Sequence, residues 1–355
     1  MLRRKAVLGA LLAPATLSRA VTAAGFIQAD PIRAPARAQD LILRHRVAGY
    51  RIGDLERRFA RLGLEEDFLY AYGFMPPATA RLLHPRDPLT SGRHEVPVEL
   101  AADVLAFVRE RGPTHPAELV ERFGRDRAVN GWGGFSKATT QVLQSLHYHG
   151  SLRVVGRRDG IRLYAANTAP HDPLAPDERR RRLVMLVLRI LAPLPEPSLA
   201  PTFGLLGRGA PGLGGWRDAL ARLLATGEVE SGEVDGVRWF WPAEDGEARR
   251  GGRRSVRLLA PFDPIVWDRR RFELLWGWPY RFEAYTRPGQ RQLGYYAMPL
   301  LWGHEVIGWA NLSMPGDRLA VELGFVTGRP ADAAFERALD AELAAMEDFL
   351  RSGDD

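Results

Sequence analysis

The stretch that decides the fold is residues 151–165, SLRVVGRRDGIRLYA. Apolar and polar residues alternate on both sides of Asp159-Gly160, which is typical of half-buried strands. An Asp-Gly pair between two such runs indicates a two-residue turn, because both residues of that turn need a positive φ. The sequence therefore predicts a β-hairpin. Its surface is basic, with arginines at Arg153, Arg157, Arg158 and Arg162.

Three helices are predicted to precede this hairpin. Residues 99–111 place apolar side chains at helical spacing. GPTHPAELVERFG at 112–124 indicates a turn and a short helix, and KATTQVLQSLHYHG at 137–150 indicates a helix capped by Ser136. Three helices and a basic hairpin follow the order of a winged helix, in which the third helix lies in a DNA groove and the hairpin contacts phosphates. The hairpin arginines and Lys137 are therefore candidate DNA contacts; a protein–protein module is the alternative.

A second copy of the pattern lies at residues 178–243. LARLLATGEVESGEVDGVRWFWP at 220–242 parallels LQSLHYHGSLRVVGRRDGIRLYA at 143–165, which makes an internal repeat. A Pro/Gly-rich loop is expected ahead of the second helix of this copy. The second hairpin is acidic, so we expect it to act as a scaffold without touching DNA. Its acidic residues are Glu228, Glu230 and Glu233.

The chain changes character from residue 255. Four stretches then read as strands, and an amphipathic helix is predicted at 331–350. We predict an α+β fold in which tandem winged helices precede a β-rich or barrel-like C-terminal domain. The strands are expected within 255–268, 282–288, 292–314 and 318–326. The domains are expected at 1–95 (helical or winged-helix), 96–170 (winged helix), 171–247 (second winged-helix-like unit) and 248–355 (β-rich, with the final helix).

Composition narrows the function. The 355 residues include no cysteine, which excludes disulfides, thiolate metal sites and a cysteine nucleophile. No run of about 20 apolar residues is present to span a membrane, and no motif for a metal or cofactor appears. The net charge is +6, and Lys5 and Lys137 are the only lysines. The lack of cysteine fits a cytoplasmic protein. Arginine suits phosphate, so we expect a nucleic-acid partner; a coding bias toward arginine is the alternative.

A polar pair follows the first apolar run, in GFIQADPIR at residues 25–33. Extended backbone would place Gln28 and Asp30 on one face, and Pro31 disfavours a helix at the preceding residue. A structural alternative is that Asp30 holds a turn and Gln28 is a surface residue. Residues 36–62, which follow, show helical spacing.

Three parts of the chain together resemble the winged-helix DNA glycosylase superfamily of AlkZ and YcaQ. They are GFIQADPIRAPARAQDLILRHR at 25–46, the two helix-plus-hairpin units, and the stretch from Leu258 to Trp309 that begins LLAPFDPIVWD. The resemblance implies a C-shaped clamp on duplex DNA that hydrolyses the N-glycosidic bond of alkylated purines, and in some members unhooks interstrand crosslinks. It also implies a Gln-X-Asp active-site motif, here Gln28-Ala29-Asp30.

The chemistry of that reaction suits these two residues. A carboxylate stabilises the positive charge that builds on the sugar and can orient the attacking water, while an amide can hold that water. An alkylated purine is already cationic, so it leaves without a strong general acid. Asp30 and Gln28 are thus the catalytic candidates. Better-known members also carry a histidine in an aromatic stretch, which EDFLYAYGFMPP at 66–77 lacks.

The remaining expectations concern DNA. Arg33, Arg37 and Arg44 follow the motif and could bind phosphates beside the lesion, or form a solvated helix face. We therefore predict a metal-free, monofunctional DNA-repair glycosylase without a cofactor, acting as a monomer on duplex DNA in base excision of alkylation damage. The alternative is a non-catalytic winged-helix regulator that binds DNA.

Overall fold

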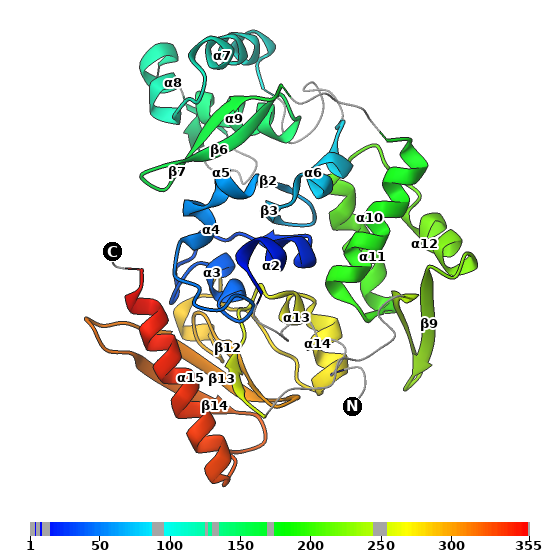
Figure 1. Ribbon diagram of the computed structural model, residues 1–355, viewed down its shortest axis with the longest axis vertical. Coiled ribbons are helices and arrows are strands. Elements are labelled where there is room, and N and C mark those ends of the chain that lie inside the picture. Colours follow the sequence, from blue (N-terminus) through cyan, green and yellow to red (C-terminus); the bar gives the residue numbers. More distant parts are fainter. Residues whose placement is uncertain are drawn as a thin grey trace. The chain divides into compact units, whose positions relative to one another are not determined.

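The computed structural model describes residues 4, 8, 15–86, 96–124, 127–129, 135–168, 174–243 and 254–353, with the side chains of 127–129 and 135–136 left aside (Figure 1). The chain forms an α+β fold with two compact units. Unit 1 contains Met1–Leu55, Leu183–Thr202 and Arg217–Asp355, and unit 2 contains Glu56–Arg182 and Phe203–Trp216. The C-shaped arrangement and the division into four domains stay predictions. Within the described ranges, no helix is both long and apolar enough to cross a membrane.

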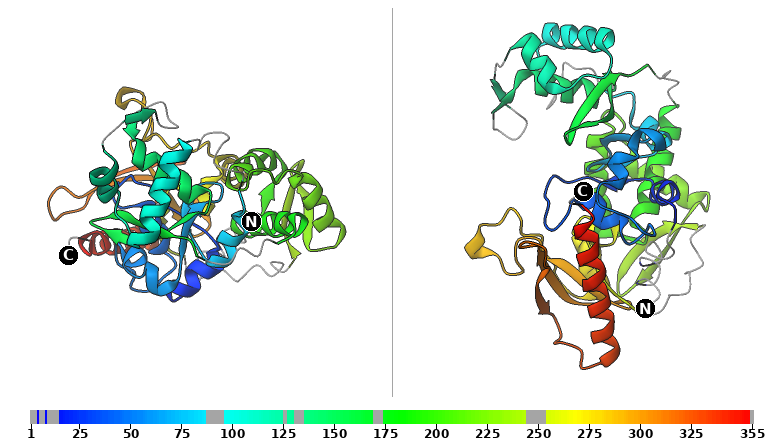
Figure 2. Two further views of the ribbon diagram at one scale, coloured as in Figure 1. Left: turned by 90° about the horizontal axis from the view of Figure 1, so that it is seen from above. Right: turned by 60° about the vertical axis from the view of Figure 1, so that its left-hand side comes forward.

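The predicted hairpin is confirmed in unit 2. Asp159 and Gly160 have φ of 54° and 75°, the left-handed values that a two-residue hairpin turn requires. Figure 2 shows the hairpin beside the helices that precede it. The elements of this part are α7 (Val98–Arg111), α8 (Pro116–Phe123), β4 (Arg127–Val129), β5 (Phe135–Lys137), α9 (Ala138–Tyr148), β6 (Leu152–Arg158) and β7 (Ile161–Ala166).

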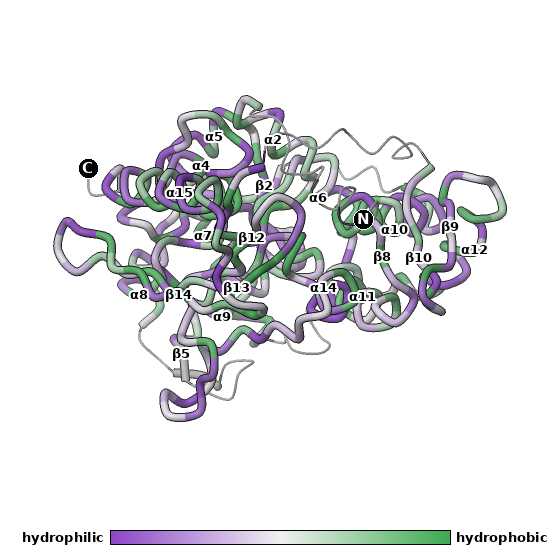
Figure 3. Tube along the Cα trace, turned by 90° about the horizontal axis from the view of Figure 1, so that it is seen from below, coloured by the Kyte–Doolittle hydropathy of each residue, from purple (hydrophilic) through white to green (hydrophobic). Residues whose placement is uncertain are grey.

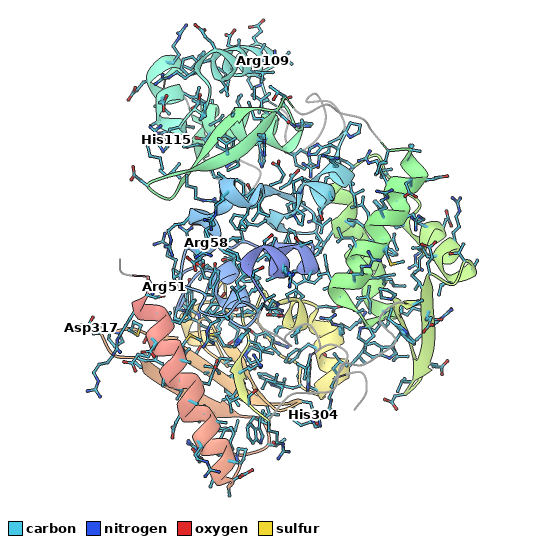
Figure 4. The ribbon with its side chains drawn as sticks, viewed as in Figure 1. Arg51, Arg58, Arg109, His115, His304 and Asp317 are labelled. Atoms are coloured by element: carbon cyan, nitrogen blue, oxygen red, sulfur yellow. The ribbon has the colours of Figure 1, made fainter. Side chains whose placement is uncertain are left out.

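Local signals set the ends of these helices. His115 is the N-cap of α8 (Figure 4) and accepts a hydrogen bond from the backbone N–H of Ala117, while Glu118 accepts from the backbone N–H of His115. This reciprocal arrangement satisfies donors that a helix start leaves unpaired. The N-cap of α9 is Lys137 and makes no side-chain cap bond, so the prediction of Ser136 as the cap was wrong by one residue.

The helix predicted over 36–62 is broken into short pieces. Asp40 Oδ1 accepts hydrogen bonds from the hydroxyl of Tyr50 at 2.8 Å and from the backbone N–H of Gly53 at 3.0 Å. Gly53 has a φ of 79°, which a helix does not allow. The pieces are α3 (Ala38–Leu43), α4 (Asp54–Arg57) and α5 (Phe59–Leu62), followed by β2 (Glu65–Phe68), β3 (Tyr72–Met75) and α6 (Pro77–Leu83).

The second copy of the pattern also contains a helix and a hairpin, which turns at Asp235-Gly236 with φ of 53° and 73°. The loop expected before it is instead a helix that contains Pro201. Proline has no N–H to donate, and the carbonyl of Pro197, one turn earlier, accepts from Arg270 at 3.3 Å. The elements are α10 (Pro176–Leu191), β8 (Leu194–Pro195), α11 (Glu196–Gly209), α12 (Trp216–Ala225), β9 (Val229–Val234) and β10 (Val237–Pro242).

An antiparallel sheet of four strands forms the C-terminal part of unit 1. Its order is β11-β12-β13-β14, so β11 and β14 are open edges and the sheet is not a barrel. The helix α15 covers one face, with the Phe335 ring centroid 5.7 Å from that of Trp302 and 6.3 Å from that of Phe325 (Figure 1). The elements are β11 (Val256–Leu258), β12 (Met298–Trp302), β13 (Glu305–Ser313), β14 (Ala320–Phe325) and α15 (Ala333–Arg351).

The other main body of apolar side chains in unit 1 gathers around α13 (Pro264–Trp267) and α14 (Arg269–Trp276). Phe272 lies at its centre, with ring centroids 4.8 Å from Trp276 and 5.9 Å from Trp278. These tryptophans therefore pack in the core. Hydrophobic stretches alternate with hydrophilic ones along the trace in Figure 3.

The strand predicted at 282–288 was wrong. Glu283 is buried and its carboxylate accepts the backbone N–H groups of Gln292 and Leu293 at 2.8 and 2.7 Å. These two bonds tie Glu283 to a later part of the same loop. Residues 282–288 form no strand. Residues 281–297 hence form a loop that holds only the short 3-10 helix η3 (Pro288–Gln290) and leads into β12.

Candidate active site

The Gln-X-Asp motif follows the first described helix of unit 1. The helix α2 (Leu17–Ala24) ends at Gly25, whose φ is 66°. A Cβ at Gly25 would lie 2.7 Å from Cδ1 of Leu186, so another residue would strain the backbone and displace the end of the Leu186 side chain. Phe26 and Ile27 are then buried, and β1 (Ile27–Gln28) leads directly into the motif.

Asp30 is half-buried and oriented by its own loop. Its Oδ1 accepts a hydrogen bond from the backbone N–H of Ile32 at 2.9 Å, which is an Asx turn. No described residue donates to Oδ2, so one carboxylate oxygen is fixed and the other is left for a further partner. Burial raises the pKa of Asp30 above the ordinary aspartate value, and the Ile32 bond lowers it in part. The turn interpretation is thus correct for Oδ1.

Gln28 presents an unused polar atom in the same segment. Its Oε1 is buried, and no described residue donates to it. Buried polar atoms are usually hydrogen-bonded, and each exception needs a reason. This amide oxygen, two residues before Asp30 in the sequence, could accept hydrogen bonds from a water molecule or from a sugar hydroxyl group.

Tyrosines from the loop 281–297 lie near Asp30. The Asp30 carboxylate, after burial, is the next cause that raises the pKa of Tyr285 and of Tyr296. Tyr285 is 79% exposed, whereas Tyr296 is 3% exposed. Arg291 steadies the loop by donating from Nε to the carbonyl of Thr286 at 2.9 Å. The loop thus places one open aromatic ring and one buried phenol near the carboxylate.

The three arginines that follow the motif have different surroundings. Arg33 is exposed and has no ion-pair partner among the described residues. Arg37 is partly buried at the N-cap of α3. Arg44 is nearly buried and forms a 2.7 Å ion pair with Glu342. This pair links the end of α3 to α15 within unit 1. A phosphate contact by any of them stays a prediction, and for Arg44 it would require this pair to open.

The hairpin arginines are largely occupied within unit 2. Arg157 and Arg162 both bind the buried carboxylate of Glu66, Arg162 at 3.0 Å. Arg153 pairs with Glu65 at 2.5 Å. Arg158 is more exposed and lies 3.3 Å from Glu118. Contact of these arginines with DNA stays a prediction, as does contact by Lys137, which is exposed at the start of α9.

The aromatic stretch at 66–77 is part of a buried polar network. Burial would raise the pKa of Glu66, but Arg157 and Arg162 outweigh it and hold the pKa below its ordinary value. Asp67 accepts from Arg86 and His84, each at 2.8 Å. These two carboxylates are satisfied by the protein itself, so we assign them to stability.

A histidine from another element, α9, lies beside this aromatic stretch. His147 of α9 lies with its ring centroid 6.3 Å from that of Tyr72, and burial lowers its pKa, so the ring is neutral near pH 7. Within the ranges that the structure describes, no group of three or more histidine, aspartate or glutamate side chains could hold a metal ion.

Tyr285 and Tyr296 could not be linked to Asp30 from the sequence, because they lie more than 250 residues from it in the chain. Both tyrosines lie within the stretch 258–309 that carries the family resemblance, and this position was the one sequence feature that could have pointed to them. Asp263, in the same stretch, has a structural role: it caps α13 by accepting from the N–H of Ile265 at 3.0 Å, and it binds Arg46.

The family comparison covers almost all of this chain. The sequence model of the AlkZ-like DNA glycosylases matches residues 21–349, which contain the Gln28–Asp30 motif and the tyrosine loop. The match supports DNA glycosylase activity and hence DNA binding. The chain belongs to the AlkZ-like DNA glycosylase family.

Proposed function

We propose that this protein hydrolyses the N-glycosidic bond of alkylated purines in duplex DNA as a monofunctional, metal-free glycosylase. The observation that carries the proposal is Asp30: one carboxylate oxygen is fixed by Ile32, and the other has no partner among the described residues. An ionised carboxylate in that state can face the oxocarbenium ion that forms as the base leaves. The exposed ring of Tyr285 lies near it.

The substrate class follows from charge. An N7-alkylated purine carries a positive charge that is lost as the glycosidic bond breaks, so the base needs no general acid. The π-face of Tyr285 attracts cations and would favour such a base over an unmodified one. Gln28 would hold the attacking water, whose proton passes to Asp30.

Hydrolysis by water, without strand cleavage, is the expected outcome. Lyase chemistry uses an amine nucleophile, and Lys5 and Lys137 are the only lysines in the chain. Winged-helix units would then grip the duplex. Binding should weaken steeply with salt, because contacts to phosphates release counterions.

The test uses a duplex with one N7-methylguanine, incubated with excess protein, and measures abasic sites by alkaline cleavage. Asp30→Asn should lower the rate by about 100-fold or more while DNA binding, measured by fluorescence anisotropy, is kept. Asp332→Asn is the matched control, because Asp332 also accepts from the N–H two residues on, at 2.8 Å, but caps α15. Binding by the wild type without base release would favour a non-catalytic regulator. A crosslinked duplex forms a separate arm of the assay.

A further inference from the structure

The hydroxyl of Tyr296 is a buried donor without a partner. The side chain is 3% exposed, and no described residue forms a hydrogen bond with the hydroxyl oxygen. The neighbouring Tyr280 shows the usual arrangement, since its hydroxyl donates to the carbonyl of Ala297 at 2.6 Å. A phenol that is buried yet unpaired needs a functional or structural reason.

Two phenylalanine rings pack against the ring of Tyr296. The ring of Tyr296 lies edge-on to Phe282, with centroids 5.4 Å apart, and to Phe262, with centroids 6.4 Å apart. Both contacts are with the ring and leave the oxygen at its tip unused. The phenol is therefore held by apolar contacts alone, and removal of its oxygen should leave the packing intact.

Among the described residues, Asp30 is the one carboxylate whose charge acts on Tyr296. The groups that act on Tyr296 are Asp30, Tyr280, Tyr285 and, in the opposite sense, Arg269. Burial first and Asp30 next raise the pKa of Tyr296 well above its ordinary value, so the hydroxyl keeps its proton at neutral pH. Asp30 Oδ2, in turn, has no donor among the described residues.

We propose that Tyr296 is a positioning residue whose hydroxyl donates a hydrogen bond to Oδ2 of Asp30 when the site assembles on DNA. Hydrogen bonds in active sites are often long without substrate and shorten in the reactive complex. With Ile32 on Oδ1 and Tyr296 on Oδ2, the carboxylate would be held at both oxygens. A donor to the ionised form also lowers its pKa, which offsets the burial of Asp30. The inference rests on the proposed function of Asp30.

The first test compares Tyr296→Phe with the wild type in single-turnover release of N7-methylguanine across pH. We expect a loss of about 10-fold or more in rate with DNA affinity unchanged. The acidic limb of the pH–rate profile should move to higher pH, because Asp30 loses a donor to its ionised form. Tyr280→Phe is the control, since it removes a hydroxyl bonded to a backbone carbonyl. It should leave the limb in place.

The second test does not depend on activity. The Asp30 carboxyl resonance, assigned with Asp30→Asn, is titrated by ¹³C NMR in complex with an undamaged duplex. Its midpoint should rise in Tyr296→Phe and stay unchanged in Tyr280→Phe. An unmoved midpoint overturns the role of Tyr296, whether or not the wild type releases base. Absence of base release by the wild type overturns only the proposed function. A slower variant with an unmoved limb would show a merely structural role.

Discussion

The backbone N–H of Ile32 binds Oδ1 of Asp30 at 2.9 Å and so fixes a carboxylate whose other oxygen has no described donor. This relationship reconciles two interpretations of the same residue. The turn holds the side chain in one rotamer, and the exposed face of the carboxylate stays available for chemistry. The loop hydrogen bond is therefore compatible with the proposed catalytic role of Asp30.

Asp30→Asn should be at least as stable as the wild type at pH 7. Burial raises the pKa of Asp30 in the folded state. The charged carboxylate therefore destabilises the folded state above that pKa, whereas below the unfolded value of about 3.9 the group is protonated in both states and has no such effect. Asparagine removes the charge and can still accept from Ile32. Thermal unfolding from pH 3 to pH 8 should show the advantage of the variant growing with pH. A large loss of stability at pH 7 would contradict this account.

Tyr285→Ala should weaken binding to N7-methylguanine duplex by about 5- to 160-fold, because stacking of one base on an aromatic ring contributes about 1–3 kcal/mol. Tyr285→Phe keeps the ring and should bind nearly as well. Anisotropy titrations of methylated and unmodified duplex measure both the affinity and the preference for the cationic base. Since Tyr285 is 79% exposed, neither change should alter the melting temperature, and unchanged binding by the alanine variant would exclude stacking.

Arg33→Ala and Lys137→Ala should each reduce the salt dependence of DNA binding. Both side chains are exposed and have no ion-pair partner among the described residues, and each lost phosphate contact lowers the slope of log K against log salt by about 1. Arg157→Ala should instead reduce stability, because Arg157 binds the buried Glu66. Affinities between 50 and 200 mM salt, paired with thermal melts, separate the two classes. An Arg157 variant that is stable but binds poorly would restore the prediction of a phosphate contact.

Glu66→Gln should cost about 3–5 kcal/mol of unfolding free energy, because it leaves Arg157 and Arg162 without their buried partner. The pKa values of Glu66 and Asp67 lie below their ordinary values in the folded state. Their contribution is therefore present above about pH 4 and is lost as the pH falls through the folded values. Urea unfolding at pH 3 to pH 7 should show a flatter acid dependence in the variant.

Glu65→Gln is the control for that measurement. Glu65 pairs with the half-exposed Arg153 at 2.5 Å, and exposed pairs contribute about 0–1 kcal/mol. A loss as large as that of Glu66→Gln would mean that burial does not decide the effect.

Arg46→Lys should destabilise unit 1 by about 1.5–3 kcal/mol, the contribution of a charge-assisted hydrogen bond. Two guanidinium nitrogens of Arg46 bind both oxygens of the buried Asp263, at 2.7 and 3.0 Å. Lysine keeps the charge but has no planar fork to match the carboxylate. Urea unfolding measures the change, and Arg33→Lys at an exposed site should leave stability unaltered.

Local sequence determined much of this protein. The Asp159-Gly160 and Asp235-Gly236 turns and the helix at 333–351 could all be predicted from the sequence, because turn chemistry and helical periodicity act over a few residues. The same short range explains the errors. The segment 282–288 shows a strand pattern, yet the buried Glu283 turns it into a loop.

Tertiary structure alone decided how the charges and the candidate site are arranged. From the sequence, the hairpin arginines are available cations. In the structure, Arg153 and Arg157 are paired with Glu65 and Glu66, about 90 residues away. Arg44 likewise meets Glu342, and Tyr285 and Tyr296 come near Asp30 from the far end of the chain. A one-dimensional pattern does not specify such pairs, because the folded backbone chooses which distant side chains share a low-dielectric environment.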